Sequence, residues 1–188
     1  KIDEARREVE RVYKIADQLG AGRFIAFSYY HKTKMALADG DRILAEKAVN
    51  EGLIISRTSS HTFAGPCLLG LKGYLSPSQK ERELHWNEAK KMLEQGCPGH
   101  NHLFFIRDVI DICLIEKNWE TCNEYCALLE KNTAKEPLPW SSLVISRGRF
   151  LSLLGQGKGV GDVSLELKSL EDECRRLGVI TLIPLIEQ

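Results

Sequence analysis

The residues best suited to chemistry lie in one short segment, GCPGHNH, which contains Cys97, His100 and His102. A thiolate and two imidazoles are ligands that zinc prefers, and their spacing would allow all three to reach one ion. A closed structural zinc site usually needs four ligands, and no obvious fourth lies nearby in the sequence. We therefore favour an ordinary loop between helices, and keep an α-helical metal-binding or enzymatic domain using these residues as an alternative.

Three further cysteines form a second candidate group. Cys122 and Cys126 are four residues apart and share one face of a helix, and Cys113 lies on the helix predicted before them. Together they could bind a metal or form a redox pair. Because free cysteine also packs as a small apolar residue, we interpret this group as part of the core.

Two other patterns match catalytic or phosphate-binding motifs only in part. In the loop GQGKGVGD, Lys158 is followed by Gly159 and not by the Ser or Thr of a P-loop. His61 follows Ser59 and Ser60, but no strand–turn–helix elbow or third member of a nucleophilic triad accompanies them. We therefore predict no catalytic residue, no cofactor and no enzymatic activity in this chain, although a longer parent protein could carry catalytic domains elsewhere.

Composition excludes several classes of partner. Of the 188 residues, 43% are hydrophobic and 28% are charged, as in soluble globular proteins. The 26 basic and 26 acidic side chains cancel, so neither nucleic acid nor an anionic membrane is a predicted partner. No apolar stretch is long enough to cross a bilayer, and the charged first residues do not form a signal peptide. Six scattered cysteines favour a reducing, cytoplasmic location.

The hydrophobic pattern predicts helices throughout the chain. Over residues 2–19, apolar residues recur at alternating spacings of three and four, which indicates an amphipathic helix. Similar segments then pair across short turns rich in Gly, Pro, Asn and Asp. The predicted hairpins cover approximately residues 23–57, 63–95, 103–132 and 140–177. No segment alternates with the period of a strand.

The predicted hairpins begin about every forty residues, a period typical of helical solenoids. We therefore predict an all-α fold, a right-handed α-solenoid of about four helical hairpins with an extra N-terminal helix. Residues 1–188 are expected to form a single helical-repeat domain. The chain begins inside a predicted helix and ends just after the apolar run VITLIPLI, so we expect a fragment of a longer protein.

A pattern in the second helices resembles a known family. Trp86-x-x-Ala89 and Trp119-x-x-Cys122 match each other 33 residues apart, and Arg42-x-x-Ala45 is a weaker copy. This pattern is similar to the second helix of a tetratricopeptide repeat, and the resemblance extends over most of residues 23–177. It implies that the small residue lies where two helices approach closely. The region from DICLIEKNWETCNEYCALLE onward also resembles helical repeats that follow ATPase or nucleotide-cyclase modules in multidomain signalling proteins.

The resemblance implies that the first helix of each hairpin lines a concave groove. Counting back from the predicted turns places five residues at inward positions: Tyr30, Lys34, Arg107, Asp111 and Arg147. Arg can pair with a carboxylate through two hydrogen bonds and Tyr offers a rigid ring, so these types suit peptide recognition. We expect a protein-interaction or regulatory scaffold module for a protein or peptide partner, or for other domains of the parent chain. An oligomerisation or spacer domain, self-associating through helix 2–19, is a further alternative.

Overall fold

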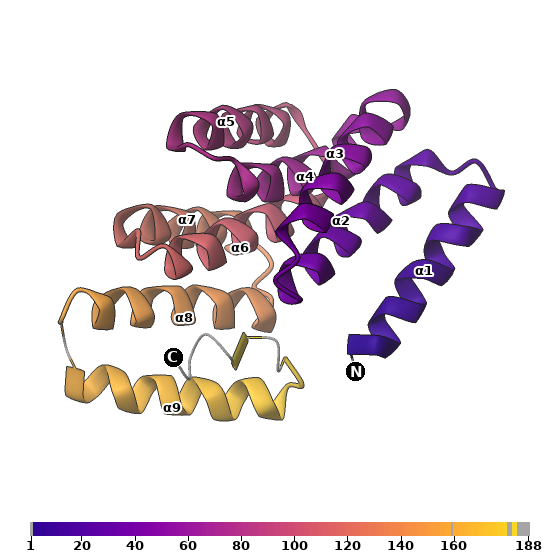
Figure 1. The fold of residues 1–188 in the computed structure, drawn as a ribbon. Helices are drawn as coiled ribbons and strands as arrows, with labels where there is room; N and C mark the ends of the chain where they lie inside the picture. Colours follow the sequence, from indigo (N-terminus) through magenta and orange to yellow (C-terminus); the bar gives the residue numbers. More distant parts are fainter. Residues whose placement is uncertain (1, 159, 180–181, 184–188) are drawn as a thin grey trace. The chain divides into compact units, whose positions relative to one another are not determined.

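The computed structural model describes residues 2–158, 160–179 and 182–183 of the chain. These residues form α-helices joined by short turns and contain no β-strand (Figure 1). The helices are α1 (Ile2–Gln18), α2 (Gly22–Ala38), α3 (Arg42–Ser59), α4 (His61–Leu75), α5 (Gln79–Gln95), α6 (Gly99–Ile115), α7 (Trp119–Thr133), α8 (Pro139–Gly155) and α9 (Val160–Arg176). The predicted all-α solenoid is confirmed for this part of the chain. None of its helices is both long and apolar enough to span a membrane.

Neighbouring helices pack in succession. α2 packs on α3 and α4 on α5, and α3 also contacts α4, so that one hairpin supports the next. The first helices of the hairpins begin at residues 22, 61, 99 and 139, which gives a repeat of 38 to 40 residues. The helix bounds lie within four residues of those predicted from the turn signals.

By their internal contacts, the residues divide into two compact units, Lys1–Phe105 and Ile106–Gln188, with the boundary inside α6. Each unit has a buried apolar core. In the first unit this core includes Leu68 and Leu69, and in the second it includes Ile110, Leu129 and Val144. The organisation as one domain stays a prediction.

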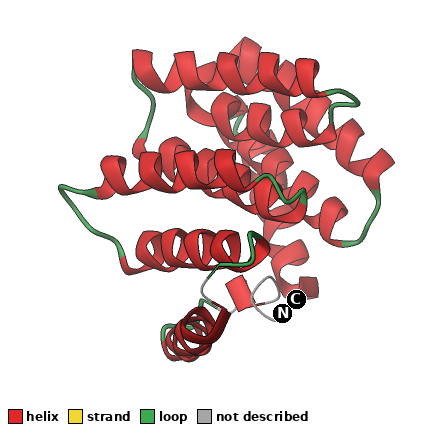
Figure 2. Ribbon diagram, turned by 90° about the vertical axis from the view of Figure 1, so that its left-hand side faces the viewer, coloured by secondary structure: helices red, strands yellow, loops and turns green. Residues whose placement is uncertain are grey.

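Local turn residues end the helices where the sequence indicated (Figure 2). Gly40 adopts a positive φ of 75° after α2, and the carboxylate of Asp41 then accepts a hydrogen bond of 2.9 Å from the Leu44 amide. After α6, Lys117 takes the left-handed conformation at φ 58°, and Asn118 caps α7. These caps satisfy amide groups that have no partner inside the helix.

Two tryptophans pack directly on glycines of neighbouring helices. The Trp86 indole of α5 lies against Gly73 of α4, where an added Cβ would be 2.3 Å from Nε1. The same Nε1 donates a 3.1 Å hydrogen bond to the carbonyl of Gly70. Trp119 lies against Gly155 of α8 in a similar way, with an added Cβ 2.2 Å from the ring. The absence of a side chain is what allows each ring to reach the helix backbone.

The two tryptophans do not occupy equivalent repeat positions. Trp86 is the eighth residue of α5, whereas Trp119 is the first residue of α7. The first residue of α3 is Arg42, so only the Arg42 and Trp119 copies of the sequence pattern correspond in the structure. The match at 33 residues is therefore wrong as a repeat alignment, because the helices repeat about every 40 residues.

α4 contains a proline in its interior, and α6 compensates for it. Pro66 has no N–H to bond the carbonyl of Thr62, four residues earlier. That carbonyl instead accepts a 3.0 Å hydrogen bond from Nδ2 of Asn101, which is fully buried. Asn101 also donates to the Phe63 carbonyl at 3.0 Å and accepts from the Cys67 thiol at 3.1 Å. One side chain of α6 thus completes the hydrogen bonding of α4.

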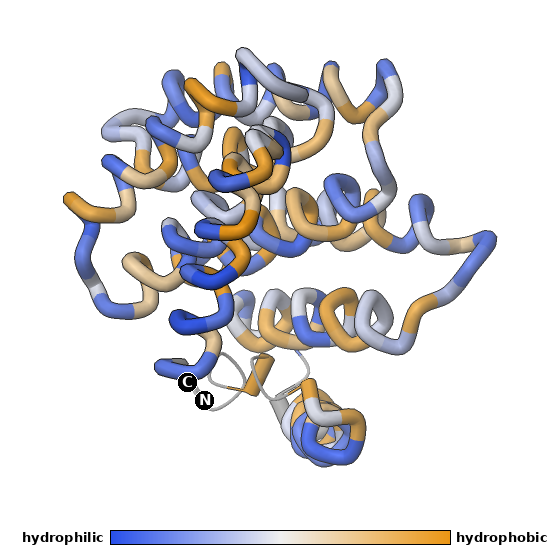
Figure 3. The backbone as a smooth tube through the Cα atoms, turned by 90° about the vertical axis from the view of Figure 1, so that its right-hand side faces the viewer, coloured by the Kyte–Doolittle hydropathy of each residue, from blue (hydrophilic) through white to orange (hydrophobic). Residues whose placement is uncertain are grey.

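Apolar and polar residues alternate around the individual helices, as expected for amphipathic helices (Figure 3). The apolar stripe of α1 is only partly buried. It packs on α2 and buries Ala16, but Val12, Ile15 and Leu19 expose 49%, 48% and 75% of their surface. Near the other end, Leu182 and Ile183 are buried. The rest of the C-terminal apolar run, residues 180–181 and 184–188, lies outside the described residues.

Candidate functional site

The five residues predicted to line a groove occupy matching positions in their helices. Tyr30, Arg107 and Arg147 are each the ninth residue of a first helix, and Lys34 and Asp111 are each the thirteenth. Their exposure differs from the expectation for two of them. Tyr30 and Arg147 each expose only 1% of their surface, so they lie in the cores of the two units and not on an open surface.

Tyr30 is buried because aromatic rings cover it. Its ring stacks on Phe27 of the same helix, with centroids 5.6 Å apart, and on Phe104 of α6, at 6.0 Å. Lys34, one turn further along α2, is half-buried. The phenol at this position therefore supports the packing of α2 against α6 within the first unit.

In the second unit, the predicted charged residues bind one another. The Arg147 guanidinium forms an ion pair with Asp111 through Nη2 and donates to the Leu182 carbonyl at 3.5 Å through Nη1. Its buried Nε has no hydrogen-bond partner in the described part of the chain. Arg107 pairs with Asp108 at 2.7 Å and lies 5.6 Å from the centre of the Trp140 ring. These charges are therefore engaged within the protein.

A feature that sequence analysis missed is a cluster of rings on the first helices, here called the aromatic face. Its members come from α2, α4 and α6 and are Phe24, Phe27, His31, Phe63, His100 and Phe104. Neighbouring ring centroids are 4.9 to 6.1 Å apart. Phe24 is 39% exposed and the others are half-buried. The Arg23 guanidinium lies 4.8 Å from the centre of Phe24 and 5.5 Å from that of Phe63.

The cysteine and histidines of the GCPGHNH segment make separate contacts. The Cys97 thiol donates to the Met92 carbonyl at 3.1 Å, and His100 Nε2 lies 2.9 Å from the carbonyl oxygen of Phe63. Burial raises the pKa of Cys97 and lowers the pKa of His102, which favours the neutral form of each. Within the described residues, no group of three or more His, Cys, Asp or Glu side chains is placed to hold a metal ion.

The lowered pKa of His102 predicts a loss of stability in acid. On acidification the unfolded chain binds a proton at the ordinary histidine pKa of 6.5, whereas the folded chain does so only at lower pH. Protonation therefore favours unfolding as the pH falls through that range. We expect His102→Gln to lose less stability than the wild type between about pH 7.5 and pH 5. Urea unfolding at both pH values measures this, and equal losses in the two proteins would contradict it.

His61 does not form a nucleophile system with Ser59 or Ser60. Its Nδ1 lies 2.9 Å from Oγ of Ser56, and its Nε2 lies 3.6 Å from a carboxylate oxygen of Glu88. The Ser56 hydroxyl is fully buried and donates to the Leu53 carbonyl at 3.1 Å. Because this hydroxyl is not exposed to solvent, the contact with His61 joins α3 to α4 and presents no reactive oxygen at the surface.

The other two candidate groups also have internal roles. Cys113, Cys122 and Cys126 are buried, and Cys126 contacts the backbone of α8 at Gly148. A hydrogen bond with Cys122 lowers the pKa of Cys126 and raises that of Cys122. These contacts support the packing interpretation. In the glycine-rich loop, the Lys158 ammonium donates to Gln156 at 2.9 Å, and Gly159 lies outside the described residues.

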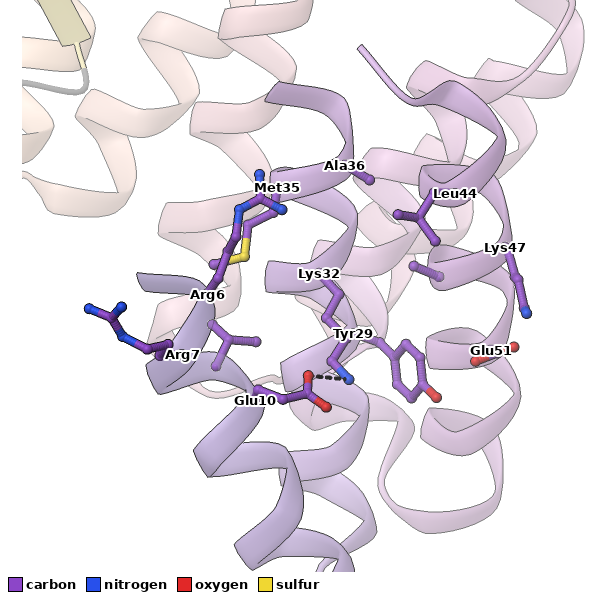
Figure 4. A pocket seen from close by; sticks show the side chains of 12 residues that line it. Arg6, Arg7, Glu10, Tyr29, Lys32, Met35, Ala36, Leu44, Lys47 and Glu51 are labelled. Atoms are coloured by element: carbon purple, nitrogen blue, oxygen red, sulfur yellow. Dashed lines mark ion pairs between the residues drawn. The ribbon is translucent and has the colours of Figure 1, made fainter. Parts of the chain in front are cut away.

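A hollow in the first unit lies between α1, α2 and α3 and is here called the α1 groove (Figure 4). Its volume is about 560 Å³, within the range of ligand-binding sites. Its apolar lining residues are Val9, Met35, Ala36, Leu44 and Ala48. Its polar and charged lining residues are Arg6, Arg7, Glu10, Tyr29, Lys32, Lys47 and Glu51.

Polar contacts fix several of these lining residues. The Lys32 ammonium pairs with Glu10 at 2.9 Å and lies 3.8 Å from the centre of the Tyr13 ring. Burial raises the pKa of Tyr29, and a hydrogen bond with Glu51 adds to this shift, so the phenol stays protonated. Sequence analysis did not anticipate the groove, because its three helices contribute residues that are up to 45 positions apart.

No known protein family, curated protein or solved structure matches this chain.

Proposed function

We propose that this chain is a protein-interaction module, a tetratricopeptide-type stack of helical hairpins that binds a peptide segment on its aromatic face. The partner is another protein or another domain of the same parent chain. One observation carries the proposal: rings from three successive first helices touch one another and stay partly open to solvent. A connected apolar surface of this kind gains free energy when a partner covers it.

The residue types of the aromatic face suit peptide binding. Aromatic and arginine side chains are enriched among the residues that dominate binding energy at protein interfaces. The rings can pack on apolar or proline side chains of a peptide, while Arg23 can pair with a carboxylate. Arg23 contacts the rings of Phe24 and Phe63 and has no ion-pair partner among the described residues. The six free cysteines are consistent with action in a reducing compartment, and we propose the cytoplasm.

A selection of short random peptides displayed on phage tests this function. We expect the wild-type chain to select peptides rich in apolar and aromatic residues. The double variant Phe24→Ala/Phe63→Ala should weaken binding of the selected peptides by at least about tenfold, because two rings of the surface are removed. Fluorescence anisotropy with labelled copies of the selected peptides measures the affinities.

A matched control removes an exposed apolar side chain elsewhere in the same unit. Leu84 of α5 is 62% exposed and lies outside the aromatic face, so Leu84→Ala should leave peptide affinity unchanged. Circular dichroism spectra of all variants verify that they remain helical. If the selected peptides bind the aromatic-face variant as tightly as the wild type, the proposed site is wrong.

A further inference from the structure

The α1 groove has a charge pattern that its own residues do not neutralise. Both of its carboxylates are engaged, Glu10 by the Lys32 ammonium and Glu51 by the Tyr29 phenol. Arg6 pairs with Asp39, which lies outside the lining of the groove. Arg7 and Lys47 are exposed and have no ion-pair partner in the described part of the chain. Because the Tyr29 phenol is neutral, Glu51 keeps its negative charge, but the two unpaired cations outnumber it and leave the groove with a net positive charge.

These two cations come from different helices. Arg7 belongs to α1 and Lys47 to α3, and Figure 4 shows them at opposite edges of the groove, with the Arg7 side chain extending outward from α1. The lining also contains apolar side chains, of which Leu44 of α3 is 50% exposed. An occupant that matches this pattern has an apolar side chain flanked by negative charges.

We propose that the α1 groove binds an acidic amphipathic peptide segment of a partner protein. An apolar side chain of the segment packs on Leu44 and Met35, and its carboxylates pair with Arg7 and Lys47. Because the chain as a whole carries no net charge, this attraction is local to the groove. A nucleic-acid backbone fits less well, since its closely spaced phosphates offer no apolar side chain to pack on Leu44 and Met35.

The site is separate from the aromatic face. No residue of the aromatic face lines the α1 groove. The two surfaces can therefore be inactivated independently, and failure of one proposal is distinguishable from failure of the other.

Binding of two synthetic peptide pools to the full chain tests the proposal. In one fluorescein-labelled pool, Asp and Glu alternate with Leu, Ile and Phe at helical spacing; in the other, Lys and Arg replace the acidic residues. We expect the wild-type chain to bind the acidic pool more tightly than the basic pool. The double variant Arg7→Glu/Lys47→Glu should bind the acidic pool about tenfold or more weakly. It should also gain affinity for the basic pool, a change that misfolding would not produce.

A second charge reversal serves as the matched control. Lys80 and Lys91 of α5 are exposed and lie outside the groove, so Lys80→Glu/Lys91→Glu changes the net charge equally. This control should bind both pools as the wild type does. Leu44→Ser should weaken binding of the acidic pool without reversing its charge preference, because it removes the apolar contact alone.

Three outcomes would overturn the proposal. If the acidic pool binds the wild type and Arg7→Glu/Lys47→Glu equally tightly, the peptides bind elsewhere on the protein. If neither pool binds the wild type, this class of ligand is excluded. If the wild type instead self-associates in light scattering and Arg7→Glu/Lys47→Glu abolishes that association, the occupant is a second copy of the chain.

Discussion

Gly73→Ala is expected to destabilise the protein by about 1–3 kcal/mol, although alanine is intrinsically the better helix former. The new methyl group would lie 2.3 Å from Nε1 and 2.5 Å from Cδ1 of Trp86. To make room, the indole must move away from α4, which breaks its buried hydrogen bond to the Gly70 carbonyl. Loss of that bond adds about 1 kcal/mol to the cost of overpacking. Urea unfolding followed by circular dichroism measures the change.

Two further variants, one at another glycine and one at Trp86, test whether the clash with Trp86 causes the loss of stability. An added Cβ at Gly99, the first residue of α6, meets no atom within 4 Å. Gly99→Ala should therefore leave stability unchanged or raise it slightly. If the clash with Trp86 is the cause, Trp86→Phe in the Gly73→Ala background should cost less than Trp86→Phe alone. Strictly additive losses would show that the two residues do not act on each other.

Arg147→Ala is expected to cause the largest loss of stability, about 2–4 kcal/mol. The substitution removes a long buried side chain and deprives Asp111 of its cation. Asp111 remains about one-fifth exposed, so water partly replaces the lost partner and keeps the cost below that of a fully buried charge. If Arg147 instead served an open binding surface, the same substitution would leave unfolding in urea unaffected.

Two comparisons distinguish the contribution of the ion pair to stability from that of side-chain packing. Arg147→Met/Asp111→Leu removes both charges while filling much of the space, so it should be more stable than Arg147→Ala. Arg149 lies on the same helix and pairs with Glu130 at 2.7 Å, but both side chains are well exposed. Arg149→Ala should therefore lose far less stability than Arg147→Ala. Equal losses for the two arginines would contradict the assigned role of Arg147.

The sequence predicted the helices well because the signals that end them are local. Gly40, Asp41 and Asn118 adopt the turn and cap conformations that their types favour, whereas Lys117 adopts a left-handed conformation that lysine seldom takes. The largest difference lies at α6, which begins at Gly99 and not near 103. There, apolar periodicity starts later than the helix, since the first turn contains Gly, His and Asn.

The candidate site was less predictable, because exposure depends on contacts from distant parts of the chain. Periodicity placed Tyr30 and Arg147 correctly at the ninth position of their helices. It did not show that Phe104 would stack on Tyr30 or that the Leu182 carbonyl would accept a hydrogen bond from Arg147. The aromatic face had a detectable signal, since Phe24, Phe27 and His31 share one face of α2. Its continuation to Phe63 is a tertiary contact.

The proline and glycines of α4 have a consequence for how the first unit folds. A segment that contains Gly65, Pro66, Gly70 and Gly73 has little helix-forming tendency of its own, so α4 alone would remain a disordered coil in water. In the folded protein Trp86 packs on Gly73 and donates to the Gly70 carbonyl, and Asn101 donates to the carbonyl that Pro66 leaves without a donor. Because Asn101 belongs to α6, we expect the second hairpin to need the start of α6 for its stability. We also expect the backbone amides of α4 and of the start of α6 to exchange with solvent hydrogen in one cooperative opening.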